Sequence, residues 1–346
     1  MRKTTIFILT ILSCFGIKAQ NSKMESIKTK IIYDVEDHGT IIKTSLPFRI
    51  GILIDDATSK EKSSAYFEPW TGSDSGSDIE AFLQKLNIPE ASRPDLSRFL
   101  ANMSKIRKLE LFVIKMSKAD FANNLSEKAA DSKLYKSMRK MESDYHKSLD
   151  ILMSDYHFSK NTDDTLLLQK TETLAEEFQV PFIAATKDSR SNSDFSLVRV
   201  QAPATSDTYH NPAFSIAEQV ANNFDRYAWP VVSEQAEPFS YQLIACRFAQ
   251  YIKTILQNKI GSLMTRANVE SFLNTWISQY VLLDDRAPLA VQAAYPLKSA
   301  RIAIEDVSNE PGSYMATMFI QPQFLLGAQP TYIRLVFKLP PVQSAP

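Results

Sequence analysis

Glycine is scarce in this chain, with 8 residues among 346. This scarcity disfavours the glycine-rich loops that hold phosphate groups in nucleotide-binding proteins. Cysteine is also rare, so we expect no disulfide framework, and Cys246 is most simply a small buried apolar residue. Lys plus Arg equals Asp plus Glu, with 39 of each. This balance gives no indication of nucleic acid or another polyanion as a partner.

Familiar catalytic patterns are missing as well. The sequence has no H-E-x-x-H, C-x-x-C, phosphate-loop glycine-lysine or G-x-S-x-G motif. His146 and His157 repeat in S-D-Y-H words, but on one helix they would lie about 16 Å apart, too far to share a metal ion. Asp55 and Asp56 end a predicted strand and are more simply exposed polar residues than catalytic carboxylates. We therefore expect no enzyme activity, cofactor, metal ion or small-molecule substrate.

The clearest pattern lies between Ser240 and Leu339, where two helices precede three strands. The first predicted helix has an apolar stripe at Ile244, Phe248, Tyr251 and Ile255. Gly261 ends it, and Thr265 is a candidate N-cap for the second helix, whose stripe is Val269, Phe272, Leu273, Trp276, Ile277 and Tyr280. The period then changes to two in 300–307, 314–321 and 331–339, which predicts an antiparallel meander.

The first half of the chain predicts a hairpin, short helices and strands. Residues 28–35 and 40–55 are extended runs joined by a turn at 37–39, and Pro47 suggests an edge or a bulge. Helices are expected at 78–86 and 94–103, and a strand at 109–115. A charged helix should begin near Glu127, with one face formed by Leu134, Met138, Met141, Tyr145 and Leu149. The run 73–78 has acidic residues but lacks the closing glutamate of a calcium loop, so it is expected to be a solvated loop.

Residues 149–186 read as strand, helix and strand, which is a βαβ unit with parallel strands. Asp163 or Asp164 is expected to cap its helix. Asn211 is expected to cap a later helix with Pro212 at its first position, and a loop is expected from Pro230 to Pro238.

Two parts of the chain resemble the large subunit of the contractile sheath of type VI secretion systems. The C-terminal resemblance rests on CRFAQYIKTILQNKIGSLMTRANVESFLNTWISQYV at 246–281, YPLKSARIAIEDVSNEPGSYMATMFIQPQFLLG at 295–327, and YIRLVFKLP. The middle resemblance rests on LMSDYHFSKNTDDTLLLQKTETLAEEFQVPFIAA at 152–185. A strand ending in Y-D-V, followed by a turn and L-P-F, is similar to the beginning of the small subunit of the same sheath.

The resemblance implies an α/β fold like that of contractile tail sheaths, a mixed sheet with flanking helices and a C-terminal antiparallel meander. Composition and the resemblance together divide the chain into five segments: 1–20 a signal-like leader, 21–56 a small-subunit-like hairpin segment, 57–78 a flexible linker, 79–148 a helical or mixed region, and 149–346 a large-subunit-like domain. The resemblance accounts for the second and the fifth, whereas the leader is inferred from residues 1–20 alone. The resemblance also implies strand exchange with sheath subunits, an inner tube protein, a baseplate and a AAA+ recycling ATPase as partners, and a cytoplasmic location.

A second interpretation is an exported or lipid-anchored binding protein derived from a sheath. The basic start and apolar run of residues 1–20 favour it. On the first interpretation, the hairpin and the C-terminal strand are candidates for exchange. The predicted interface residues are Arg247, Tyr251, Lys259, Trp276, Tyr280, Arg301, Phe319, Gln321, Phe324, Tyr332, Arg334 and Lys338. For Arg247 and Lys259 the alternative is a solvated helix face.

Overall fold

The structure is a computed structural model. It describes residues 31–55, 66–88, 90–116, 133–144, 147–158, 162–186, 197–201, 211–228, 237–258, 265–284, 286–308, 310, 313–323 and 332–339. The predicted leader at 1–20 lies outside these residues. None of the described helices is long and apolar enough to cross a membrane.

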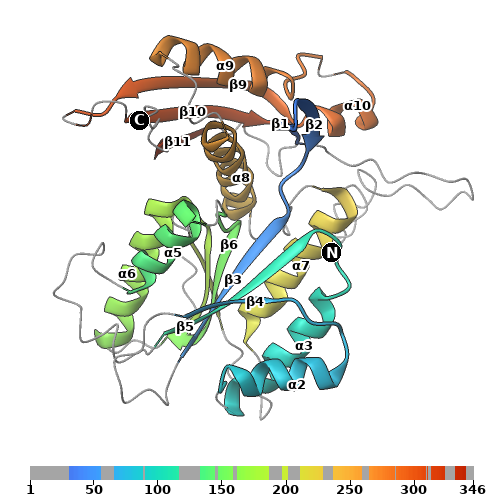
Figure 1. The fold of residues 1–346 in the computed structure, drawn as a ribbon, viewed down its shortest axis with the longest axis vertical. Coiled ribbons are helices and arrows are strands. Elements are labelled where there is room, and N and C mark those ends of the chain that lie inside the picture. Colours follow the sequence, from blue (N-terminus) through green and yellow to red (C-terminus); the bar gives the residue numbers. More distant parts are fainter. Residues whose placement is uncertain are drawn as a thin grey trace, which may run out of the picture.

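A six-stranded sheet forms the centre of the larger layer (Figure 1). Its strand order is β4-β5-β3-β6-β7-β8. Its strands are β3 (Phe48–Asp55), β4 (Tyr66–Trp70), β5 (Leu109–Met116), β6 (Ile151–Phe158), β7 (Phe182–Thr186) and β8 (Leu197–Gln201). All neighbours are parallel except β4, which pairs antiparallel with β5 at the edge. β3 is buried along almost its whole length, as expected for a central parallel strand covered on both faces.

Helices cover both faces of this sheet. Ile50 and Ile52 of β3 pack with α2 (Gly76–Lys85), α3 (Arg93–Met103, after the short η1 at Glu90–Ser92) and α7 (Pro212–Tyr227). Leu53 belongs to a second cluster on the opposite face, with α5 (Lys133–Asp144) and α6 (Thr162–Phe178). The predicted βαβ unit is confirmed, because β6 and β7 are parallel and α6 connects them. Asn211 caps α7, as predicted, by accepting a hydrogen bond from the Ala213 amide.

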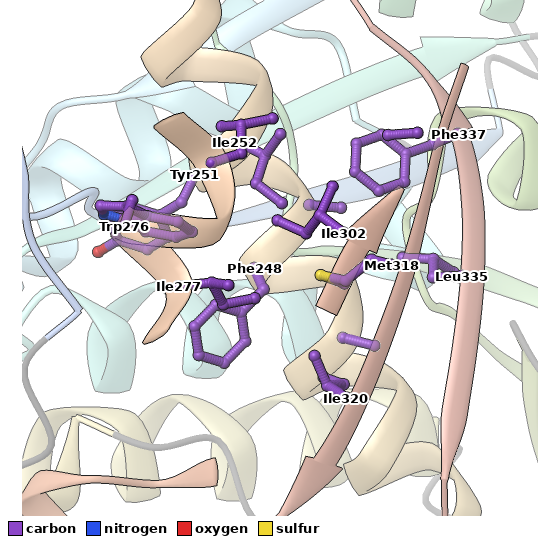
Figure 2. Close-up of a cluster of buried hydrophobic side chains, with 14 of the residues drawn as sticks. Phe248, Tyr251, Ile252, Trp276, Ile277, Ile302, Met318, Ile320, Leu335 and Phe337 are labelled. Carbon is purple, nitrogen blue, oxygen red and sulfur yellow. The ribbon is translucent and has the colours of Figure 1, made fainter. Parts of the chain in front are cut away.

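The C-terminal part forms a second layer (Figure 1). It contains α8 (Glu237–Gln257), α9 (Arg266–Ser278), α10 (Leu289–Ala294), β9 (Leu297–Asp306), β10 (Tyr314–Pro322) and β11 (Ile333–Lys338). The order β11-β10-β9 with antiparallel pairing confirms the predicted meander. Phe248 and Trp276 from the helices belong to one buried cluster with Ile302, Met318 and Leu335 from the three strands, all of which are labelled in Figure 2.

α8 joins the two layers. Phe239 and Leu243 at its beginning belong to the core under the six-stranded sheet. The buried apolar residues of its later part, between Ile244 and Leu256, belong to the core of the C-terminal layer. The mixed α/β fold expected from the sequence is therefore confirmed, with one long helix shared between its two cores.

The predicted N-terminal hairpin is present as β1 (Tyr33–Asp37) and β2 (Thr40–Thr44). His38 and Gly39 have φ of 48° and 79°, the left-handed values that a two-residue hairpin turn requires. The extended run 40–55, for which an edge or a bulge was expected at Pro47, forms two separate strands, β2 and β3. It divides at Pro47, where the chain leaves the hairpin and enters the central sheet at Phe48, so Pro47 is neither a bulge nor an edge residue.

Three further expectations are corrected. The range 57–78, predicted as a flexible linker, contains β4 and the start of α2. β4 is fixed because Trp70 packs against Phe82 at a ring-centroid distance of 4.8 Å and donates a hydrogen bond to Ser104. Leu149 lies beyond the end of α5, where it is buried beside β6. Pro238 lies in the first turn of α8, a position that needs no backbone donor, and not in a loop.

Candidate assembly interface

The C-terminal sheet has two edges, β9 and β11, because β10 pairs with both. The Leu339 amide donates to the Tyr314 carbonyl at 2.9 Å, which fixes the alternation of hydrogen bonds along β11. The backbone N–H and C=O groups of Arg334, Val336 and Lys338 therefore point away from β10. Within the described part of the chain, these outward groups have no backbone partner. β11 is thus an open edge.

Two hollows lie beside β11. The larger, of about 700 Å³, lies between residues 336–339 and helices α5, α6 and α8. The smaller, of about 260 Å³, lies between residues 334–336 and residues of α6 and α8 such as Cys246. Val336 lines both of them. The open edge is therefore flanked by space on the side of the α/β layer.

The walls of the larger hollow carry paired charges. Lys253 donates to Glu142 and to the Phe178 carbonyl, each at 3.1 Å. Arg139 lies 3.4 Å from Glu142 and 3.3 Å from Glu177. These ion pairs make the wall polar without a large excess of one charge.

The face of the C-terminal sheet that points away from its core carries most of the exposed interface candidates. Arg301, Phe319 and Arg334 lie directly opposite one another across the three strands. The two arginines are exposed and Phe319 is 39% exposed. Lys338 is exposed and paired with Glu310, and Tyr332 is 68% exposed. An aromatic ring between two cations is suited to contact with another protein.

Four predicted interface residues are buried inside the chain: Arg247, Tyr251, Trp276 and Tyr280. For Arg247, a solvated helix face is therefore the wrong interpretation. Its guanidinium pairs with Asp150 at 2.6 Å and donates to the Leu46 carbonyl at 2.8 Å. A charged residue on an apolar helix is buried only when it has such partners.

The three aromatic residues hold the segment before the hairpin. The Tyr251 hydroxyl donates to the Ile31 carbonyl and accepts from the Leu46 amide, both at 2.9 Å. Trp276 donates to the Ile32 carbonyl at 2.9 Å, and the Tyr280 hydroxyl both donates to and accepts from the backbone of Ile32. Burial raises the pKa of Tyr280 to about 12, so its hydroxyl keeps the proton that it donates.

Gln321 is also buried, and its side-chain oxygen accepts from the Ser299 hydroxyl at 3.5 Å. Lys259 and Phe324 lie outside the described residues. The sequence interpretation missed Asp150, the partner of Arg247, because the two are 97 positions apart. A lone cation within an apolar helix is the signal that would have prompted a search for a buried acid.

Comparison with known proteins finds a family match in the part of the chain that contains α8 and the C-terminal sheet. Residues 233–339 match the family model described as EvpB/VC_A0108, tail sheath gpW/gp25-like domain. The C-terminal third is thus sheath-like in sequence. It is 35% identical over 106 residues to the type VI secretion system sheath protein TssC1 of Pseudomonas aeruginosa. That match covers 30% of this chain and spans only 21% of the length of TssC1.

The matched range begins just before α8 and ends after β11. It therefore includes the helix shared by the two cores, the whole C-terminal sheet and the open β11 edge. The resemblance of the N-terminal hairpin to a small sheath subunit stays a prediction.

Proposed function

We propose that this protein is a structural subunit of a contractile type VI secretion sheath and that it assembles by strand addition at β11. The observation that carries this proposal is the open edge of β11 within the part of the chain that matches the tail-sheath family. The proposed role is mechanical, with no chemical reaction, and the proposed location is the cytoplasm.

Strand addition uses groups that β11 already presents. An extended segment beside Arg334, Val336 and Lys338 satisfies their outward backbone groups through main-chain hydrogen bonds. β11 has six residues, a length of about 20 Å, which is typical of a strand in a globular protein.

The proposed donor is the β1–β2 hairpin of a second copy of this chain. A hairpin of two strands is marginally stable by itself, and Ile41 and Ile42 of β2 are 69% and 47% exposed. β1 carries exposed acidic residues at Asp34 and Glu36, whereas β11 carries the cations Arg334 and Lys338. Opposite charges on neighbouring strands favour this pairing.

The remaining partners follow from the family resemblance. The proposal includes other small and large sheath subunits, an inner tube protein and a baseplate. A AAA+ recycling ATPase is a further proposed partner. The sequence has no match to the helix near the start of the large subunit that such an ATPase grips.

Sedimentation velocity and negative-stain microscopy of the protein lacking Met1–Gln20, alone and with sheath subunits, test the proposal. We expect rings, tubes or other large ordered oligomers, and we expect deletion of Tyr332–Pro346 to abolish them. Deletion of Pro341–Pro346 is the control, because it leaves β11 intact.

A point substitution tests the edge more sharply, because deleting β11 also removes core residues. Val336→Pro removes one outward donor and leaves the hydrogen bonds to β10, since proline is tolerated on an edge strand. Val336→Thr is the control, because it keeps the donor. We expect the proline variant to stay folded and monomeric and the threonine variant to assemble. A wild-type protein that stays monomeric in every mixture contradicts the proposal and favours the exported binding protein.

A further inference from the structure

On the other edge of the C-terminal sheet, β9, side chains of α9 are partners for the outward backbone groups of Ile302 and Ile304. Asn274 of α9 accepts from the Ile302 amide at 3.0 Å and donates to the Ile302 carbonyl at 2.7 Å. Glu270 accepts from the Ile304 amide at 3.0 Å. Arg266 donates to the Ile304 carbonyl at 3.1 Å. Two successive outward-facing residues of β9 are therefore satisfied by side chains.

The three side chains come from one face of one helix. Arg266, Glu270 and Asn274 are four residues apart, so they follow each other along the side of α9 that runs beside β9 (Figure 1). The beginning of β9 is covered in another way. The Leu297 amide donates to the Tyr280 carbonyl at 3.0 Å, and the Leu297 carbonyl accepts from the Leu282 amide at 2.8 Å.

The chemistry of Asn274 suits this position. A carboxamide has a donor and an acceptor side by side, like a peptide group, so one asparagine satisfies both backbone groups of Ile302. An incoming strand has to displace Asn274, Glu270 and Arg266 before it can pair with β9. The same strand meets no such competition at β11, where the outward groups of Arg334, Val336 and Lys338 lack backbone partners among the described residues.

We propose that Arg266, Glu270 and Asn274 close the β9 edge, so that the C-terminal sheet accepts a strand from a second copy at β11 alone. This inference rests on the proposed function and specifies which edge of the sheet accepts the strand. A sheet open at both edges joins to others of its kind in uncontrolled chains, whereas a sheet with one closed edge takes one partner strand and stops.

Hydrogen–deuterium exchange at single-residue resolution tests the closure directly. In the wild-type protein, the Ile302 and Ile304 amides should be protected and the Val336 amide should exchange rapidly before assembly. Asn274→Ala should make the Ile302 amide exchange about five to ten times faster, the effect of losing one hydrogen bond. Arg301 and Ala303, whose amides face β10, should keep their protection.

Asn268→Ala is the matched control, because Asn268 lies on the same helix, is exposed and does not reach β9. It should leave the Ile302 amide unchanged. Glu270→Ala should speed the exchange of the Ile304 amide in the same way. The test therefore does not depend on the folding of a single variant. Ile302 and Ile304 amides that exchange as fast as Val336 in the wild-type protein would overturn the inference.

A double variant tests the consequence for assembly. Val336→Pro removes an outward donor of β11. The single variant, in which α9 is unchanged, should therefore sediment as a monomer. Asn274→Ala with Val336→Pro should associate again, now through β9. A double variant that stays monomeric contradicts the role of Asn274 as a barrier. The proposed function fails by a different observation, namely a Val336 amide that gains no protection when copies of the wild-type protein are mixed.

Discussion

The guanidinium of Arg247 lies 2.6 Å from the carboxylate of Asp150, and both side chains are 3% exposed. Asp150 also accepts from the Arg49 amide at 2.8 Å, at the beginning of the central strand β3. The Arg247 guanidinium stacks over Phe224 of α7, 4.5 Å from the ring centroid. This pair therefore ties α8 to the central sheet, where the two layers of the protein meet.

Removing one member of the pair should be strongly destabilising. Asp150→Ala leaves a buried guanidinium without its counterion, and we expect a loss of about 3–5 kcal/mol in the free energy of unfolding. Urea denaturation measures it. Replacing both residues, with Arg247→Met and Asp150→Leu, should cost much less than the sum of the two single changes. A single Arg247→Met variant as stable as the wild type would show that the pair contributes nothing.

Tyr280→Phe should loosen the segment before the hairpin. The substitution removes both hydrogen bonds to Ile32 and keeps the ring among Phe248 and Trp276. We expect a loss of about 1–2 kcal/mol and faster exchange of the Ile32 amide. Tyr295→Phe is the control, because that side chain is 41% exposed. Equal exchange of the Ile32 amide in both variants would contradict the role of Tyr280.

Stability should depend on pH through Asp155 of β6. Burial raises the pKa of Asp155 to about 7, Asp95 and Asp55 add to the rise, and a hydrogen bond from Ser92 opposes it. The folded protein therefore holds a proton that the unfolded chain has already released above its ordinary pKa of 3.8. This stabilisation is complete below about pH 4 and is lost as the pH rises through 7.

Asp155→Asn should remove the loss of stability that the wild type shows as the pH rises through 7. We expect the variant to equal the wild type in unfolding free energy near pH 4 and to exceed it by roughly 1–3 kcal/mol at pH 8. Thermal unfolding of the variant and the wild type at both pH values measures this difference. The other titrating groups are the same in both proteins, so their contributions cancel. A variant that is destabilised equally at both pH values would contradict the raised pKa.

Gly51 in β3 has no room for a methyl group. A Cβ atom there would lie 2.6 Å from the Cδ1 atom of Leu149 and 3.3 Å from those of Ile114 and Leu152. Gly51→Ala should therefore cost about 1–3 kcal/mol, because leucine and isoleucine ends must shift within a packed core. Denaturant unfolding measures it, and a stability equal to that of the wild type would show that the core relaxes freely.

The elements with strong periodicity could be predicted from the sequence. The apolar stripe on α9 and the alternation of apolar and polar residues in β9, β10 and β11 are local signals. The helix and the three strands form as expected. β4 was missed because its five residues lie within a polar region and depend on pairing with β5, which is distant in the chain. Local pattern says little about such tertiary pairing.

The candidate interface was predictable only in part. Arg301, Phe319, Arg334 and Lys338 alternate outward on strands, so their exposure follows from the period. Arg247 and Tyr251 were placed at an interface but bind Asp150, Ile31 and Leu46, which are separated from them by long stretches of sequence. The closure of β9 also needs α9 to lie against its edge, and no spacing rule indicates which strand a helix will border.

Cryo-electron microscopy of the assembled protein is the most direct test of assembly by strand addition. The central claim predicts ordered particles in which a strand of a neighbouring subunit lies beside β11, hydrogen-bonded to Arg334, Val336 and Lys338, while α9 still covers β9. Ordered particles in which β11 faces solvent, or in which a neighbouring strand pairs with β9, would contradict it.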